Sequence, residues 1–330
     1  MNRKVSVAPM MDCTDKHERY FLRLISKNVF LYTEMIVSEA IDRGDKKKLL
    51  SFNLEEKLVA LQIGGSSPSL LGNAAKLGED FGYDEINLNL GCPSKKVQKN
   101  KFGACLIKEP NLVVDCLEKM VSSTKLPVTV KTRIGYDNVE TYEHLYNFIE
   151  KLKSTGVKTF IIHARKAMLG KFTPKQNLNI PPLKYEMVYR LKKDFKDLEI
   201  IINGGISQID EMKNHLDYVD GIMLGRAVYH SPYLLAEIEK EIFKNNQIPS
   251  REDVIERLIP YVKSEIKKGT RINQVMRHTL GLFHGQTGSN YWKRYLSKNM
   301  CVRDADVKKI DHIMDKIKNR KIEASVGRID

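Results

Sequence analysis

The fold is decided by the stretch Glu85-Ile86-Asn87-Leu88-Asn89-Leu90-Gly91-Cys92-Pro93. Its first half is a short, largely apolar run, which predicts a buried β-strand. Gly91 allows backbone angles that are closed to other residues, and Pro93 prevents the strand from continuing. We therefore expect Cys92 on a sharp turn at the end of a strand. There a thiol can serve as a nucleophile, a metal ligand or a proton donor.

Seven further apolar runs occur along the chain, separated by longer segments with helical periodicity. They are Val5–Ala8, Val29–Tyr32, Val59–Gln62, Val128–Lys131, Phe160–His163, Ile200–Asn203 and Gly221–Leu224. Near-continuous apolar runs are typical of parallel strands that are buried on both faces. Eight such strands alternating with helices predict an α/β fold, a (β/α)8 TIM barrel, better than an open sheet.

Nearly every predicted strand ends at polar residues, glycine or proline. In a barrel of this kind the active site lies at the carboxyl ends of the strands, so we expect these side chains to converge on one mouth. They include Pro9, Met10, Met11, Gln62, Asn89, Cys92, Lys131, His163, Arg165, Asn203, Gly204, Gly205, Gly225 and Arg226.

The pattern changes after the eighth strand. We expect a barrel domain over residues 1–243 and a C-terminal all-helical domain over residues 250–330. Residues 244–249 between them have the composition of a polar linker. Ser250 and Asp253 have capping-box spacing, which predicts the start of a helix.

The composition excludes several classes of protein. The chain has 330 residues, of which 42% are hydrophobic and 29% charged, as in globular proteins. It has no apolar run of about 18 residues and no signal-peptide pattern, so we expect no membrane association. The 5 cysteines have no paired spacing, which argues against a disulfide framework and a metal site and predicts a cytoplasmic location. No heptad seam argues for a dimer, and we expect a monomer.

The net charge is +14. The segment 241–330 alone holds 19 basic and 11 acidic residues, a net charge of +8. A basic helical domain predicts a polyanionic partner such as nucleic acid. The alternative is a lysine-rich protein with solvated helix faces.

Glycines at the ends of the last two predicted strands indicate a phosphate site. Asn203-Gly204-Gly205 and Gly225-Arg226 occupy the positions where such barrels bind phosphate. Glycine lets backbone N–H groups approach phosphate oxygens, and Arg226 can add a charge-assisted contact.

Gln62, Lys131 and His163 end three other strands. A cation and hydrogen-bonding groups around a phosphate-anchored ring suit a flavin, FMN rather than FAD, because reduced flavin carries negative charge on its pyrimidine side. The competing hypothesis is that a desolvated Lys131 forms a Schiff base, as in an aldolase. No GxGxxG motif follows the first strand, so NADPH or NADH would reach the flavin from solution.

Cys92 then has a plausible chemical role. Saturating a polarised C=C bond requires a hydride on one carbon and a proton on the other, and a thiol can donate that proton. The alternative, a buried inert cysteine, does not explain the Gly-Cys-Pro turn.

Several basic residues are candidates for RNA contacts. Arg165 and Lys175 follow the sixth strand, where they would rim the mouth. In the helical domain, basic side chains stand beside aromatic ones, which suits phosphate contacts and base stacking. The candidates there are Arg277, His278, Lys293 and Arg294.

Over essentially its whole length the sequence resembles the tRNA-dihydrouridine synthases, and within them the bacterial A-type, which acts on D-loop uridines 20 and 20a. The resemblance rests on the following stretches: Val7–Asp12, Leu31–Met35, Ala60–Gly65, Tyr83–Pro93, Phe102–Leu106, Val130–Arg133, Ile162–Lys166 and Ile202–Ile206. Ile180–Leu183 and Arg277–Gly285 are similar to the A-type in particular.

This resemblance implies an FMN-dependent, NADPH-driven reduction of the uracil C5=C6 bond in tRNA. It implies Cys92 as the acid that protonates C5 and Asn89 as a substrate contact. The implied FMN contacts are Pro9, Met10, Met11, Gln62, Lys131, His163, Asn203, Gly204, Gly205, Gly225 and Arg226. The target uridine would have to leave its stack to reach the flavin.

Three alternatives stay open from the residues alone. A small-molecule ene-reductase of the dihydropyrimidine or dihydroorotate type would not need the basic helical domain. A lyase that uses Lys131 would be colourless and could be trapped with borohydride. A non-catalytic RNA-binding protein would leave the Cys92 turn unexplained.

Overall fold

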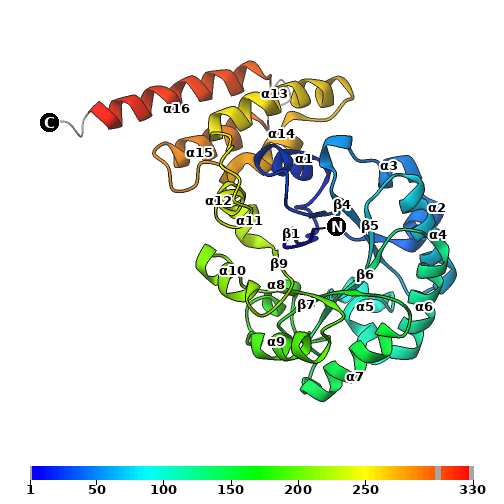
Figure 1. Cartoon of the computed structure of the whole chain (residues 1–330). Helices are drawn as coiled ribbons and strands as arrows, with labels where there is room; N and C mark the ends of the chain where they lie inside the picture. Colours follow the sequence, from blue (N-terminus) through cyan, green and yellow to red (C-terminus); the bar gives the residue numbers. More distant parts are fainter. Residues whose placement is uncertain (1, 302–305, 327–330) are drawn as a thin grey trace. The chain divides into compact units, whose positions relative to one another are not determined.

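A computed structural model, which describes residues 2–301 and 306–326, has all eight predicted strands in one parallel sheet (Figure 1). In pairing order they are β1 (Val5–Val7), β9 (Gly221–Leu224), β8 (Glu199–Asn203), β7 (Thr159–His163), β6 (Val128–Arg133), β5 (Glu85–Leu90), β4 (Val59–Gly64) and β2 (Leu31–Tyr32). A parallel bridge between Ser6 and Phe30 joins the two ends of this row, so the sheet closes. The predicted (β/α)8 barrel is confirmed. The short strand β3 (Ile36–Val37) pairs with β4 outside the row.

Helices surround the barrel (Figure 1), and the longer ones bury an apolar stripe. Helix α4 (Pro68–Asp80) begins at signals that the sequence provides: Ser67 caps the backbone N–H of Leu70, and Pro68 occupies the first turn. The helices of this unit are α2 (Ser38–Arg43), α3 (Lys46–Leu50), η1 (Leu54–Glu56), α4 (Pro68–Asp80), α5 (Lys95–Lys99), η2 (Gly103–Lys108), α6 (Pro110–Ser123), α7 (Tyr142–Lys153), α8 (Pro174–Asn177), α9 (Tyr185–Asp194) and α10 (Ile209–Leu216).

The barrel has an apolar and a charged layer inside. Buried side chains that pack together there include Phe30, Ile161 and Met223. Arg3 on the amino-terminal side of β1 forms ion pairs with Glu85 (2.5 Å) and Glu199 (2.8 Å). A buried cation is tolerated because carboxylates neutralise it.

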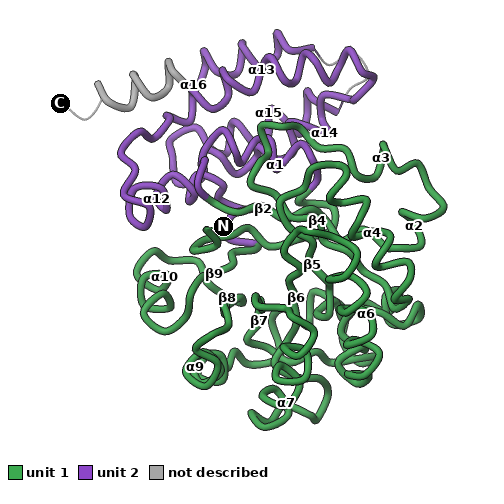
Figure 2. Tube along the Cα trace, turned by 45° about the vertical axis from the view of Figure 1, so that its right-hand side comes forward, with its two compact units in different colours: residues 1–14, 29–225 green, residues 15–28, 226–330 purple. Residues whose placement is uncertain are grey.

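The chain divides into two compact units, which Figure 2 shows in different colours. The first comprises Met1–Thr14 and Val29–Gly225, and the second Asp15–Asn28 and Arg226–Asp330. This division differs in two respects from the boundary expected at residues 243–250. The second unit begins directly after β9, and it includes a segment that follows β1.

In the described residues of the second unit, all regular secondary structure is helical. Its helices are α1 (Lys16–Ile25), α11 (Arg226–His230), α12 (Leu234–Glu241), α13 (Arg251–Lys267), α14 (Ile272–Met276), η3 (Arg277–Gly281), α15 (Ser289–Asn299) and α16 (Lys308–Val326). The capping box predicted at Ser250 is present, with Asp253 as its second member. The segment 244–249 is irregular, as predicted, but it links α12 to α13 inside this unit.

Candidate active site

The turn that carries Cys92 follows β5 and is held by several hydrogen bonds. The side-chain oxygen of Asn89 accepts hydrogen bonds from the backbone N–H groups of Gly91 (3.1 Å) and Cys92 (3.0 Å). The carbonyl oxygen of Cys92 accepts one from the N–H of Ala104 (3.0 Å). A Cβ atom at Gly103 would lie 2.7 Å from that carbonyl oxygen, so only glycine fits there. The half-buried Cys92 thiol is therefore presented on a tightly held turn.

A chain of side-chain hydrogen bonds runs from this turn into the barrel. Asn89 Nδ2 donates to Gln62 Oε1, Gln62 Nε2 donates to Asn87 Oδ1, and Asn87 Nδ2 donates to Thr129 Oγ1, each at 2.8 Å. The Thr129 hydroxyl donates to Glu85 Oε1 at 2.6 Å. A buried network whose members are satisfied fixes the orientation of each amide. Gln62 and Asn89 therefore form one rigid assembly.

Lys131, His163, Asn203 and Gly204 converge at the ends of β6, β7 and β8. The Lys131 ammonium donates to Asn203 Oδ1 at 3.0 Å, and Asn203 Nδ2 donates to the carbonyl oxygen of Met223 at 2.8 Å. Gly204 has a φ of 122°, and a Cβ atom there would lie 2.8 Å from His163 Cδ2. The structure thus brings together the residues that the sequence predicted at these strand ends.

Lys131 is the electrostatic centre of this group. Burial, assisted by the neighbouring Arg133 guanidinium, lowers its pKa to about 7, although Cys92 acts in the opposite direction. A buried amine of this kind is stabilised by a ligand that presents negative charge or acceptor atoms. The site therefore fits a ligand that presents hydrogen-bond acceptors or negative charge to Lys131.

Glycines line the mouth near β8 and β9. Gly205 has a φ of 77°, and a Cβ atom there would lie 2.7 Å from Leu183 Cδ1. A Cβ atom at Gly225 would lie 3.6 Å from Met10 Sδ, which places the ends of β9 and β1 close together. We call these glycines the glycine cradle, because backbone N–H groups of glycines at strand ends can approach a phosphate. Arg226 follows Gly225 in the chain but is the first residue of the second unit.

The residues after β1 complete the predicted cofactor set. Pro9 and Met10 are half-buried, and the N–H of Met10 donates to the Thr14 hydroxyl at 2.9 Å. Met11 is 56% exposed, so its side chain is accessible at this strand end.

The two predicted RNA contacts in the barrel unit differ in exposure. Lys175 is exposed on α8. Arg165 is half-buried, and its guanidinium donates to the carbonyl oxygens of Asn179 and Pro181. Arg165 therefore supports the chain after β7 as well as contributing charge.

The predicted contacts in the second unit also differ. Arg294 and Arg277 are exposed and Lys293 is half-buried. The His278 side chain is completely buried, 3.1 Å from an Asp15 carboxylate oxygen and 3.2 Å from Glu18 Oε2. This burial is at odds with the direct RNA contact that the sequence predicted for His278.

Sequence reasoning did not single out Arg133, although it lies within the Lys131-Thr132-Arg133 motif. Its side chain is only 3% exposed and donates to three backbone carbonyl oxygens near the mouth. Its position two residues after Lys131 on the same strand was the available signal, because residues i and i+2 share a face.

Within the described residues, no group of three or more histidine, cysteine, aspartate or glutamate side chains could hold a metal ion. In the same part of the chain, no helix is long and apolar enough to cross a membrane. None of the five cysteines, all of which lie in the described residues, forms a disulfide.

A parallel barrel with a thiol, a buried amine and a glycine-lined cradle at its carboxyl ends defines a (β/α)8-barrel enzyme. Comparisons with known proteins define the family. A family model of dihydrouridine synthases matches residues 6–318. The chain belongs to the dihydrouridine synthase family, and it is accordingly an oxidoreductase that acts on a CH–CH bond.

Two relatives illustrate the similarity. A tRNA-dihydrouridine(20/20a) synthase from Synechocystis sp. is 51% identical over 302 residues, which cover 91% of this chain and 90% of the relative. The tRNA-dihydrouridine(20/20a) synthase of Escherichia coli K12 is 47% identical over 320 residues, which cover 96% and 92%.

A solved structure shares the fold alone. A 2-naphthoyl-CoA reductase in complex with 2-naphthoyl-CoA is 13% identical, with a TM-score of 0.53 over 76% of this chain and 51% of that one.

Proposed function

We propose that the protein is a tRNA-dihydrouridine(20/20a) synthase that uses FMN and NADPH. The relatives from Synechocystis and Escherichia coli carry this name, and they match nearly the whole chain. When bound, FMN would take a hydride from NADPH and supply it to C6 of the uracil ring. The Cys92 thiol would add its proton to C5, and the resulting thiolate would regain a proton from water.

The observation that carries this proposal is the Cys92 turn beside a buried cation. The Cys92 N–H is held by Asn89, and Asn89 pairs with Lys131 in the register of β5 and β6. General acid catalysis requires a donor held within reach of the receiving carbon. The turn provides such a fixed donor at a strand end, in the part of the barrel where substrates bind.

The residues of the mouth fit FMN. Lys131 would stabilise the pyrimidine side of the ring, with Gln62 and His163 around it. The glycine cradle would hold the phosphate through backbone N–H groups, with Arg226 as a charged contact. The full proposed set is Pro9, Met10, Met11, Gln62, Lys131, His163, Asn203, Gly204, Gly205, Gly225 and Arg226.

Transfer RNA is the proposed macromolecular partner. Asn89 has one Nδ2 hydrogen that its bond to Gln62 does not use, so it can contact an extruded uracil. Exposed cations would bind phosphates. They are Lys175 in the first unit and Arg277 and Arg294 in the second, with Lys293 and Arg165 as partly buried supports. We retain His278 as a residue that holds α1, not as a direct contact.

A nucleoside assay tests the proposal. The purified protein is incubated with unmodified tRNA and NADPH, and the digested RNA is analysed for dihydrouridine by mass spectrometry. We expect product from the wild type and at least about a hundredfold less from Cys92→Ala, because the proton donor is lost. Cys92→Ala should remain yellow, since the thiol is not assigned to FMN binding.

The other outcomes identify the alternatives. Yellow protein that NADPH bleaches but that forms no dihydrouridine would point to a small-molecule substrate. Colourless protein that borohydride inactivates at Lys131 would contradict the flavin proposal and favour a lyase.

A further inference from the structure

Arg133 connects two parts of the mouth that are not neighbours in the sheet. It lies at the end of β6, between β5 and β7. Its Nε donates to the carbonyl oxygen of Gly91 at 2.8 Å. One terminal nitrogen donates to the carbonyl oxygens of Lys166 (3.0 Å) and Asn177 (3.3 Å). A single guanidinium thus joins the turn after β5 to the chain after β7.

The contact with Gly91 acts on the peptide group that leads into Cys92. The carbonyl of this peptide is held by Arg133, and its N–H is held by Asn89 Oδ1 at 3.0 Å. A peptide group is planar, so fixing both of its polar atoms fixes its plane. The direction of the next side chain, the Cys92 thiol, follows from that plane.

The other contacts act on residues 164–184, which we call the β7–α9 loop. This loop folds around the buried Asn177, whose amide donates to the carbonyl oxygens of Met168 (3.1 Å) and Phe172 (3.3 Å). The N–H of Met168 donates back to Asn177 Oδ1 at 2.7 Å. The loop is therefore preformed, and it carries the exposed Lys175.

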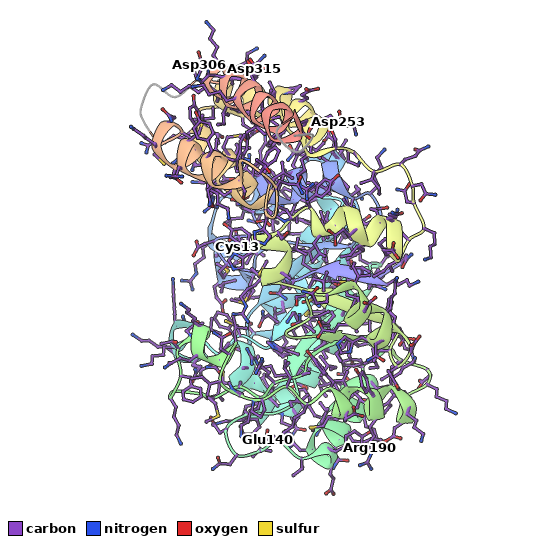
Figure 3. All side chains as sticks on the ribbon, turned by 90° about the vertical axis from the view of Figure 1, so that its left-hand side faces the viewer. Cys13, Glu140, Arg190, Asp253, Asp306 and Asp315 are labelled. Carbon is purple, nitrogen blue, oxygen red and sulfur yellow. The ribbon has the colours of Figure 1, made fainter. Side chains whose placement is uncertain are left out.

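Glu140 links the two ends of the same loop. Its carboxylate pairs with Lys166 (2.9 Å) and Lys184 (3.2 Å), close to the two ends of the loop. Figure 3 labels Glu140 on the barrel unit, in the segment between β6 and α7. This clamp does not include the Cys92 turn, which only Arg133 among these residues contacts.

Burying the charge of Arg133 is energetically unfavourable if the side chain only links two segments. Burial lowers its pKa to about 10, although the nearby Cys92 opposes this shift. The group still carries its charge at neutral pH, and its partners are carbonyl oxygens. Keeping a charge buried in this way is expensive. The rigid fork of the guanidinium offers what a neutral side chain cannot, several donors in a fixed plane.

We propose that Arg133 is a positioning residue that locks the peptide before Cys92 and couples it to the β7–α9 loop. Contact between the loop and RNA then acts on the alignment of the proton donor. The inference rests on the proposed role of Cys92 as the acid, but its test does not require catalysis.

The test compares FMN-loaded Arg133→Lys with Glu140→Gln, without RNA. Lysine keeps the charge of Arg133 but lacks its fork. Two rates are measured: alkylation of Cys92 by iodoacetamide, followed at the Cys92 peptide by mass spectrometry, and limited tryptic cleavage after Lys171 and Lys175. In Arg133→Lys we expect both rates to rise about threefold or more, because both segments lose one restraint. In Glu140→Gln we expect only the cleavage rate to rise.

Half-reactions then separate positioning from folding. In Arg133→Lys, oxidation of the reduced protein by tRNA should slow about tenfold or more, because a misplaced donor costs rate, while reduction by NADPH changes little. Unchanged alkylation and cleavage with slow oxidation would overturn the proposal in favour of a direct contact between Arg133 and RNA. Equal losses in both half-reactions and in FMN content would show a merely structural role.

A second variant covers the case in which Arg133→Lys does not fold. Asn177→Ala removes the side chain that holds the loop around the Asn177 carbonyl oxygen, to which Arg133 donates. Glu140→Gln leaves these Asn177 hydrogen bonds in place, so only Asn177→Ala is expected to disturb the contact with Arg133. The coupling predicts faster Cys92 alkylation in this variant too. An alkylation rate equal to that of the wild type, with increased loop cleavage, would refute the coupling.

Discussion

At the scale of single residues, the electrostatic properties of the candidate site depend on the burial of one amine, that of Lys131. Lys131 lies at the end of β6, and its ammonium contacts the side chain of Asn203. With a pKa of about 7, it loses much of its charge in neutral solution unless a ligand stabilises it. An anionic ligand would restore that charge. In the proposed function, Lys131 would therefore favour the reduced state of the flavin.

The reduction potential of the bound flavin tests this role. In Lys131→Met we expect a lower midpoint potential, by on the order of tens of millivolts, because about 30 mV corresponds to 1.4 kcal/mol for two electrons. Lys131→Arg keeps the charge and should shift the potential less. The measurement is a spectroscopic redox titration of both variants. Equal potentials in Lys131→Met and the wild type would contradict the role.

At the scale of elements, α1 shows that segments next to each other in the sequence can belong to different units. It follows β1 in the chain but packs in the second unit, where Tyr20 stacks on Tyr261 of α13 with a centroid distance of 3.9 Å. Beside this pair, His17 Nδ1 lies 2.7 Å from the Tyr261 hydroxyl, and Lys16 pairs with the buried Glu265 at 2.8 Å. The α1–α13 contact thus joins an aromatic stack to titratable groups.

These groups predict how the contact responds to acid. Burial lowers the pKa of His17 from 6.5 to about 4. Burial raises the pKa of Glu265, but hydrogen bonds from Lys16 and Lys268 outweigh this effect and lower the pKa from 4.5 to about 2. Both groups bind more protons in the unfolded chain. Stability is therefore lost as the pH falls, first between 6.5 and about 4 and then between 4.5 and about 2.

Thermal unfolding across this pH range checks the prediction. The unfolding temperature of the wild type should fall in both intervals. His17→Gln keeps a hydrogen-bonding side chain but cannot titrate, so its unfolding temperature should fall less in the upper interval. If the unfolding temperatures of the two proteins changed with pH in parallel, His17 would not contribute to the pH dependence of stability.

At the scale of the whole molecule, charge is the dominant feature. The net charge of +14 is spread over both units, and residues 241–330 hold a disproportionate share. A positively charged protein gains affinity for RNA mainly by releasing the counterions of the phosphates. The proposed binding to tRNA should therefore depend strongly on salt.

A salt titration of tRNA binding tests this expectation. Between about 50 and about 200 mM salt we expect an affinity loss of about a hundredfold, as for several phosphate contacts. Lys175→Ala should reduce the slope of log K against log salt by about 1. Lys4→Ala is the matched control, because Lys4 is exposed at the amino-terminal side of β1, opposite the mouth. Flat binding of the wild type would exclude an electrostatic grip on tRNA.

The sequence by itself determined the barrel and which residues stand at the ends of its strands. Most of the strands are short apolar runs, and nearly every one ends at polar residues, glycine or proline, such as Asn89 to Cys92 at the end of β5 or Lys131 near the end of β6. These signals are local, because strand burial and turn formation depend on residues a few positions apart. The same local signals predicted the helix that begins after Ser250.

Only the tertiary structure decided which of these side chains remain available. His278 is buried against α1, and Arg133 contacts carbonyl oxygens 42 and 44 residues away in the chain. The membership of α1 in the second unit is likewise a matter of packing. The residues near an amphipathic helix or a cation in the sequence do not show what it will pack against, because its partner lies in a distant segment of the chain. For this protein, the sequence determined the reactive groups, and packing decided how they are held.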